Sequence, residues 1–159
     1  MNYPHAIRLR GPWHYHVLEG RVLAGNDAGA REGRTKLPDD WSQTLGAAFR
    51  GRVRFTRRFH APAQLDADER LWLVCTGASA RADVALAEHR LGRIEGYALP
   101  AAYDITDRIA AENELVIDVD DPSTGNAPRL PVGGLTGEVR LEVRRRAWID
   151  DLCLVYQPA

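Results

Sequence analysis

Two histidines near the N-terminus have the spacing of a metal-binding pair. His14 and His16 alternate with Trp13, Tyr15 and Val17, which is the period-two pattern of a half-buried strand. Side chains at positions i and i+2 of a strand point to the same face, so both imidazoles could bind one transition-metal ion. The alternative is a pair of exposed strand histidines, which we favour because a metal site would need a third ligand nearby.

The segment around these histidines resembles the Gly…His-x-His…Glu motif of cupins, a β-barrel class that includes metal-dependent enzymes. Gly11 and Glu19 lie too close to the two histidines for that motif, and no second motif with a later histidine follows. A cupin-like metal-dependent protein is therefore the third of the functional hypotheses that the sequence leaves open.

Arg57 lies in another alternating segment, where Val53 and Phe55 share its face. A buried charge without a partner is very costly, so this guanidinium must meet a carboxylate, a cluster of carbonyls or a ligand. We expect an ion pair with Asp104 or Asp118 rather than a ligand.

Almost the whole chain has the pattern of β-strands. Alternating or wholly apolar runs, separated by Gly, Pro and Asp turns, occupy residues 13–17, 53–59, 70–76, 82–86, 115–119, 139–143 and 152–156. Such a succession predicts a β-sandwich or barrel. The run at 70–76 is apolar on both faces, which predicts a central strand. Only residues 104–112 have helical character, where Thr106 could cap one short turn.

Length and charge are those of one ordinary domain. The chain has 159 residues, enough for a single core, and a formal net charge of −1. Nucleic-acid binding would need a strong basic excess, and a membrane span would need about 18 consecutive apolar residues. We therefore expect neither partner. The N-terminus shows no secretory signal, so the expected location is the cytoplasm unless a signal has been removed.

The two cysteines lie in apolar runs. Cys75 ends one predicted strand and Cys153 lies in another. Because cysteine behaves as a small apolar residue in a core, we expect buried free thiols. A bridge between them would need Cα atoms within about 7 Å, and the sequence leaves that pairing open.

Six pieces of the chain follow one another in the order of a known domain. They are Gly11-Pro-Trp13, Pro38-Asp-Asp-Trp41, Gly51-Arg-Val-Arg-Phe-Thr-Arg-Arg-Phe-His-Ala-Pro62, Tyr103-Asp-Ile-Thr-Asp107, Asn113-Glu-Leu-Val-Ile-Asp-Val119 and Gly133-Gly-Leu-Thr-Gly-Glu-Val-Arg-Leu-Glu-Val143. Together they resemble the sugar-binding domain of family-two glycoside hydrolases. The resemblance implies a galactose-binding-like jelly-roll β-sandwich, all-β, as a single domain over residues 1–159.

The first hairpin departs from this pattern. Where family members commonly carry Asn-Gly after a Val-x-Val strand, this chain has Ala87 and Glu88 before His89. Asn-Gly favours a tight two-residue turn, which other residues can also form. Any contact that the asparagine side chain makes is lost.

The resemblance covers the sugar-binding part of the family and not its catalytic part. In the enzymes concerned a separate (β/α)₈ barrel carries out hydrolysis, and such a barrel needs roughly 250 residues. A glycosidase also needs two carboxylates roughly 5 to 10 Å apart, and no such pair stands out here. We therefore expect a non-catalytic carbohydrate-binding module. The alternative is a structural or docking subunit of a glycosidase or of a homo-oligomer, without affinity for free sugar.

Seven residues are candidates for the sugar site. A sugar ring offers an apolar C–H face and several hydroxyls, so its site needs aromatic faces and a few polar groups. The candidates are Trp41, Arg57, His89, Tyr97, Tyr103, Asp104 and Asp121.

Each aromatic candidate has a structural alternative. Large aromatics fill cores more often than they bind ligands, as we expect of Trp13 on its inward face. Trp41 follows a Pro-Asp-Asp turn, where a core role and a binding role are about equally expected. Tyr97 lies in a surface loop flanked by Gly and Pro, so we prefer it to Trp72, whose strand should be buried.

No cofactor is required by these residues. Galactose-binding-like modules that bind sugars often hold a structural calcium, and Asp118, Asp120, Asp121 and Asp150 could supply oxygen ligands. None has the fixed spacing of a calcium loop, so solvated turn acids are the preferred interpretation. The expected partners are a carbohydrate ligand and, under the alternative, a glycosidase or a second copy of the chain.

Overall fold

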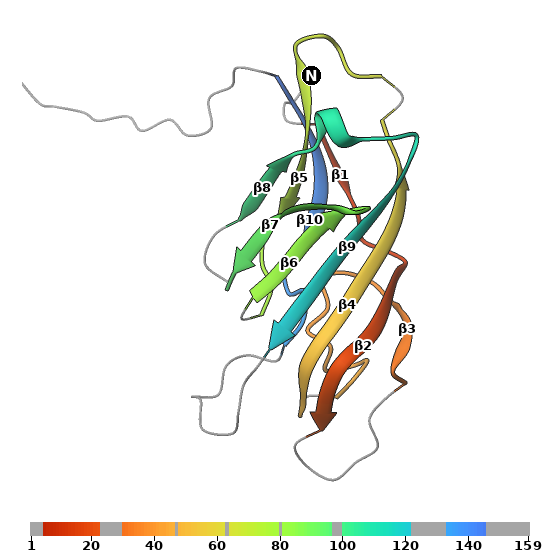
Figure 1. Cartoon of the computed structure of the whole chain (residues 1–159), viewed down its shortest axis with the longest axis vertical. Coiled ribbons are helices and arrows are strands. Elements are labelled where there is room, and N and C mark those ends of the chain that lie inside the picture. Colours follow the sequence, from red (N-terminus) through yellow and green to blue (C-terminus); the bar gives the residue numbers. More distant parts are fainter. Residues whose placement is uncertain are drawn as a thin grey trace, which may run out of the picture.

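The computed structural model describes residues 5–22, 30–46, 48–62, 64–79, 81–96, 100–121 and 133–145. Within these ranges the chain forms two antiparallel sheets that enclose one core (Figure 1). The predicted all-β sandwich is therefore confirmed. No helix of the described residues is long and apolar enough to cross a membrane.

The larger sheet has six strands. Its order across the sheet is β3 (Glu32–Thr35), β2 (Trp13–Val22), β4 (Phe49–His60), β9 (Glu112–Asp121), β6 (Arg81–Leu86) and β7 (His89–Glu95). The smaller sheet has four strands, in the order β1 (His5–Arg8), β10 (Val139–Arg145), β5 (Glu69–Cys75) and β8 (Ala101–Asp104). One short 3₁₀ turn, η1 (Thr106–Arg108), precedes β9.

The predicted strands match six of these elements. The runs at 13–17, 53–59, 70–76, 82–86, 115–119 and 139–143 correspond to β2, β4, β5, β6, β9 and β10. The run at 152–156 lies outside the described residues. β5 lies between β10 and β8, which confirms its prediction as an interior strand. The sequence pattern missed β1, β3 and β8, because strands of four residues are too short to show a period. It also missed β7, where the only large apolar residues, Leu91 and Ile94, do not alternate.

Alternate residues of the two sheets fill the space between them. Val53 and Phe55 of β4, Ile117 of β9 and Leu73 of β5 are each at most 1% exposed. The residues between them on β4 and β9 point to the outward face of the six-stranded sheet, because side chains alternate along a strand. This alternation separates an apolar interior from a charged exterior.

The corner before β9 is held by its own polar side chains. Asp104 Oδ1 accepts hydrogen bonds from the backbone N–H of Thr106 at 3.0 Å and from its hydroxyl at 2.6 Å. The Thr106 Oγ1 in turn accepts the N–H of Leu71 in β5 at 2.8 Å, and Ile105 is fully buried. The prediction that Thr106 caps the turn is wrong, because its hydroxyl is used by β5 and Asp104 supplies the acceptor.

The β6–β7 hairpin closes through a two-residue turn at Ala87 and Glu88. Ala87 has φ of 50°, in the left-handed region, and its N–H donates to the carbonyl of Glu114 at 2.7 Å. The tight turn expected from the resemblance is thus formed by a residue that carries the steric cost of a Cβ there.

Cys75 is a buried free thiol, as predicted. Burial raises its pKa to about 12, so the thiolate is not available as a nucleophile at neutral pH. Cys153 lies outside the described residues, and its pairing stays open.

Replacing Thr106 by valine should destabilise the fold by about 1–3 kcal/mol, because the Leu71 N–H loses its acceptor and the Asp104 carboxylate loses a donor. Urea unfolding at pH 7 measures the difference. Thr106→Ser keeps the hydroxyl and serves as the control, which should lose well under half as much stability. Equal losses in the two variants would contradict a hydrogen-bond role.

Replacing Ala87 by glycine should stabilise the fold by about 1 kcal/mol, because glycine adopts a positive φ without the Cβ clash. Ala102→Gly, at an exposed position of β8 that is paired in register and is not among the positive-φ residues, is the matched control and should destabilise instead. Thermal unfolding of both variants tests the pair. A lower melting temperature for Ala87→Gly would refute the strain at this turn.

Candidate functional site

The structure places the described candidate residues at separate points of the sandwich. Trp41 and Asp121 lie together near one end of the strands, while Tyr103 and Asp104 lie on β8 and His89 begins β7. Tyr97 falls outside the described residues. The six candidates that the structure describes therefore do not converge on one site.

Trp41 belongs to the core. Its side chain is fully buried and meets Phe49 edge to face, with ring centroids 5.4 Å apart. A Cβ built on Gly133 would lie only 2.0 Å from the Trp41 ring, so that glycine lets the loop pass closely over it. The expectation that Trp41 offers a ring face to a ligand is corrected, because no part of the ring reaches solvent.

Asp121 lies beside this tryptophan and is only 3% exposed. Its Oδ2 is 3.8 Å from the Nε of Arg50, and a Cβ on Gly133 would lie 2.8 Å from the same oxygen. Asp121 is thus held within the protein at the end of β9.

Arg57 is half-buried on β4, just beyond the point where β2 begins to pair with that strand. Its Nη1 donates to the Pro12 carbonyl at 2.7 Å, whereas its buried Nε has no hydrogen-bond partner. Burial lowers the pKa of this guanidinium. The predicted ion pair with Asp104 or Asp118 is wrong, because other side chains hold both carboxylates.

Tyr103 packs against β7 from the opposite sheet. A Cβ on Gly92 would lie 2.6 Å from the tyrosine ring, so the absence of a side chain there makes room for it. The hydroxyl is buried without a hydrogen-bond partner, and burial raises the pKa of Tyr103 to about 12. Asp104 is exposed but holds the corner, and His89 is an exposed residue beside the hairpin turn.

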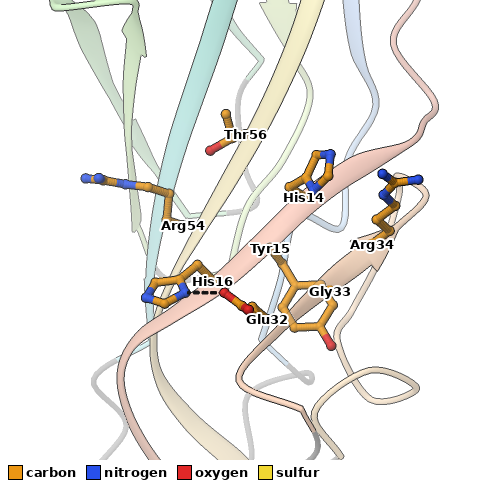
Figure 2. A pocket seen from close by; sticks show the side chains of 8 residues that line it. All are labelled: His14, Tyr15, His16, Glu32, Gly33, Arg34, Arg54 and Thr56. Carbon is orange, nitrogen blue, oxygen red and sulfur yellow. Dashed lines mark ion pairs between the residues drawn. The ribbon is translucent and has the colours of Figure 1, made fainter.

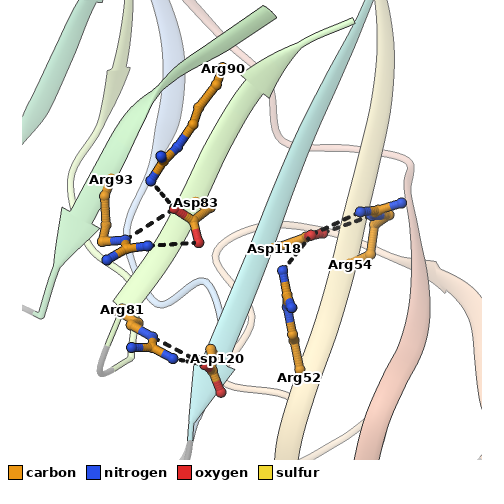
Figure 3. A network of polar contacts seen from close by, with 8 residues as sticks. All are labelled: Arg52, Arg54, Arg81, Asp83, Arg90, Arg93, Asp118 and Asp120. Atoms are coloured by element: carbon orange, nitrogen blue, oxygen red, sulfur yellow. Dashed lines mark hydrogen bonds and ion pairs between the residues drawn. The ribbon is translucent and has the colours of Figure 1, made fainter. Parts of the chain in front are cut away.

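The outward face of the six-stranded sheet carries charged residues in register (Figure 3). One cross-strand row consists of Arg54, Asp118, Asp83 and Arg93, from β4, β9, β6 and β7. The next row consists of Arg52, Asp120, Arg81 and Glu95. Opposite charges face each other at every position of the second row, which stabilises the pairing of the strands.

Asp118 is the most enclosed acid of this face, with 7% exposure. Arg54 binds it through two parallel hydrogen bonds, Nε to Oδ1 at 2.8 Å and Nη2 to Oδ2 at 2.9 Å. Arg52 adds a third, from Nη2 to Oδ2 at 3.2 Å. Two guanidinium groups therefore neutralise this carboxylate.

Asp83 lies directly opposite Asp118 on the neighbouring strand. It accepts hydrogen bonds from Arg93 Nε at 3.0 Å and from Arg90 Nη2 at 2.8 Å. The hydrogen bond from Arg93, with help from Arg90, outweighs burial and holds the pKa of Asp83 below its usual value. Separate arginine pairs thus allow two acids to sit opposite each other.

Three shallow hollows join along this face. One of about 410 Å³ lies over β2, β3 and β4 (Figure 2). A second of about 650 Å³ shares His14 and Thr56 with the first, and a third of about 490 Å³ shares Arg54 with it. Neighbouring hollows share lining residues, and we call the three together the sheet groove.

The centre of the sheet groove holds polar groups that the protein does not use. Strand pairing places Arg34, His14 and Thr56 in one row. Among the described residues, none of these three side chains has a hydrogen-bond or ion-pair partner. A guanidinium donates only, whereas imidazole and hydroxyl groups both donate and accept. The row can therefore bind hydroxyl or carboxylate groups of a ligand.

His14 and His16 are both exposed and share the outward face, as the alternation predicted. His16 Nδ1 lies 3.6 Å from Glu32 Oε2. Over the ranges that the structure describes, no group of three or more His, Cys, Asp or Glu side chains could hold a metal ion. The cupin-like hypothesis has no third ligand there.

The acids considered for calcium do not converge. Asp118 and Asp120 are held by arginines on the outward face, whereas Asp121 lies two residues from Val119 on the buried side of β9. Asp150 lies outside the described residues. The calcium prediction gains no geometric support from the acids that are described.

The outward face of the four-stranded sheet carries a second polar cluster. Glu142 is 3% exposed and accepts hydrogen bonds from Arg140 Nε at 2.6 Å and Arg144 Nε at 2.7 Å. The Arg144 guanidinium also lies 5.0 Å from the centre of the Trp72 ring. Trp72 is half-buried on this outward face, which corrects the expectation that its strand buries it.

Sequence reasoning missed the centre of the sheet groove. Arg34 lies on β3, a four-residue strand without a visible period, and Thr56 is an ordinary residue of an alternating run. The histidine pair was the only signal for this face. Arg34 and Thr56 lie beside His14 because of the register between strands, which cannot be read from a single sequence.

Comparison with protein families gives one match. The family described as "Glycosyl hydrolase 2 galactose-binding domain-like" matches residues 41–144. No curated protein matches the sequence.

Solved structures match over most of this chain but a minor part of their own. A β-glucuronidase from an uncultured Clostridium sp. has a TM-score of 0.71 at 20% identity, covering 92% of this chain and 30% of that enzyme. Bifidobacterium dentium β-glucuronidase, complexed with coumarin-3-O-glucuronide, has a TM-score of 0.66 at 23% identity. The match covers 91% of this chain and 31% of that enzyme. A GH2 β-galacturonidase from Eisenbergiella tayi, bound to galacturonate, has a TM-score of 0.66 at 20% identity. The match covers 89% of this chain and 24% of that enzyme. At these identities the likeness shows the fold.

Replacing Glu142 by glutamine should change how stability depends on pH. Burial raises the pKa of this carboxyl, but the hydrogen bonds from Arg140 and Arg144 outweigh burial and the net pKa is lowered. The stabilisation is therefore complete above the unfolded pKa, about 4.5. It is lost as pH falls through the lower folded pKa.

Urea unfolding from pH 7 to pH 3 measures this effect. Glu142→Gln should lose about 1–3 kcal/mol at pH 7 and show a smaller further loss in acid than the parent chain. Glu138→Gln is the control. It removes the charge of an acid that is more exposed than Glu142 and pairs with Arg8, so it should change stability little. Parallel pH curves for Glu142→Gln and the parent chain would refute the role of Glu142.

Proposed function

The chain belongs to the glycosyl hydrolase 2 galactose-binding domain-like family, and from that membership we propose that it is a non-catalytic carbohydrate-binding module. Its binding surface is the sheet groove on the outward face of the six-stranded sheet. The loop aromatics that the sequence favoured are not its basis, since Trp41 is buried.

The observation that carries this proposal is the unused polar row at the centre of the groove. Arg34, His14 and Thr56 lie side by side and have no partner within the part of the chain that the structure describes, while the neighbouring charges are paired across strands. Paired charges keep the surrounding surface ordered, and the unused groups are free to read ring hydroxyls. The three hollows share lining residues, and a chain of several sugar units could contact more than one of them.

A non-catalytic role is supported by the state of the acids in the groove. Three of the four acids that line it form ion pairs with arginine: Glu114 with Arg58, Asp83 with Arg93 and Asp118 with Arg54. The fourth, Glu32, lies 3.6 Å from His16 Nδ1. A glycosidase needs one carboxyl that stays protonated and a second that is free to react. The enzymes with a similar fold are named for glucuronide and galacturonide cleavage, and this chain spans about a third of their length or less.

A docking role is the second candidate, and one observation favours it. Trp72 is partly exposed on the outward face of the four-stranded sheet and stacks under the Arg144 guanidinium. Tryptophan and arginine are enriched at the centres of protein interfaces. Under this alternative, that face binds a glycosidase or a second copy of the chain.

A glycan array with the purified chain tests the proposed function, run once with calcium and once with a chelator. We expect selective binding that does not depend on calcium. The double variant His14→Ala/Thr56→Val should weaken binding at least tenfold, because it removes two unused polar groups. Circular dichroism and urea unfolding of the same samples confirm that the variant is folded.

Tyr97→Ala is the matched variant for the loop predicted from the sequence. Loss of binding in Tyr97→Ala alone would place the sugar site on that loop and refute the groove. A folded parent chain that binds no glycan would refute the module and leave the docking role.

A further inference from the structure

We infer that the sheet groove selects acidic sugars, binding the carboxylate of a uronate unit at Arg34 and His14. This inference rests on the proposed function, because it names the class of carbohydrate that the same groove takes. It is carried by the charges that line the groove and by which of them remain unpaired.

The groove around His14 has an excess of cationic groups. The two hollows that meet at His14 and Thr56 contain four arginines and two histidines but only two acids, Glu32 and Glu114. Glu32 contacts His16, and Glu114 forms an ion pair with Arg58 at 3.1 Å. Among the described residues, no acid contacts Arg34.

Arg34 has the geometry that a carboxylate needs. Its guanidinium can bind both oxygens of a carboxylate through parallel hydrogen bonds. His14 lies opposite it on β2, and Thr56 lies opposite His14 on β4. Neighbouring strands are about 5 Å apart, so a sugar ring can reach from one to the next. A uronate would place its carboxylate at Arg34 and a ring hydroxyl at Thr56.

Arg57 supplies a further cationic group at the adjoining end. It lines the hollow that shares His14 and Thr56, where its Nη1 is fixed on the Pro12 carbonyl and its Nε is buried. Arg57 therefore adds positive charge at this end of the groove, which suits a chain in which acidic units repeat.

The pattern fits an acidic sugar better than a general polyanion. Cationic and acidic groups are mixed along the charged rows, and Asp83, Asp118 and Asp120 interrupt any continuous basic stripe. A nucleic acid, with one phosphate per residue, would need such a stripe. The unpaired charge is local, which suits recognition of single carboxylates on otherwise uncharged rings.

Isothermal titration calorimetry with matched ligands tests the inference. The ligands are oligosaccharides of galacturonate, of alginate and of hyaluronan, each compared with its own methyl ester, which keeps the rings but removes the charge. At least one acid should bind about tenfold more tightly than its ester. The difference should shrink as salt is added, because the charges are exposed.

Variants of the groove locate the effect. Arg34→Ala should abolish the preference for the acid, whereas Arg34→Lys should retain part of it, since lysine keeps the charge but loses the fork. Arg10→Ala removes an exposed arginine that lines none of the three hollows and should change nothing. Circular dichroism confirms the fold of each variant.

The outcomes separate this inference from the proposed function. Equal binding of acids and esters, or binding of neutral glycans alone, would overturn the preference for uronates and leave a carbohydrate-binding module. Tighter binding of a sulfated oligosaccharide without uronate, or equal binding of polyglutamate, would show general attraction to anions and overturn it. A folded chain that binds no glycan refutes both proposals.

Discussion

The pairing of β4 with β9 determines which side of the six-stranded sheet is apolar and which is charged. Ten residue pairs join the two strands, so Phe55 meets Ile117 inside while Arg54 meets Asp118 outside. A slip of one residue would turn every side chain to the other face, burying arginines and exposing the core. The hydrophobic effect and the arginine–aspartate pairs thus favour the same register. The outer strands of the sheet then align their charges with this central pair.

The sheet groove follows from that alignment. β2 continues the register of β4 and adds His14 and His16 beside Thr56 and Arg54, and β3 adds Arg34 and Glu32. Acids on β9 and β6 balance the arginines that face them, but no acid lies opposite Arg34. The proposed specificity therefore depends on Arg34, the position at which an arginine no longer faces an acid on the neighbouring strand. The core below supplies rigidity and no direct contact to the ligand.

The fold was predictable from the sequence to a larger extent than the candidate site. Long alternating runs such as residues 53–59 predicted six strands, and the Asp-Ile-Thr corner lies where the resemblance placed it. Arg57 was correctly identified as a charge on an apolar face, but its partner is a backbone carbonyl, which sequence does not mark. For Trp41 the sequence was less informative. Its position in a loop left open that the ring is accessible to a ligand, but packing against Gly133 buries the ring. Position along a strand is a local property, whereas the neighbours of a side chain depend on strands distant in sequence.

Within the described part of the chain, each sheet ends in strands that have one free side. Three of these four edge strands, β1, β3 and β8, contain four residues each. The fourth, β7, has seven residues and carries Arg90, Arg93 and Glu95. Short or charged edges are poor templates for another β-strand, because they offer few backbone groups or would bring charges of two molecules together. The arginines that hold Asp83 therefore also protect the chain from edge-to-edge aggregation.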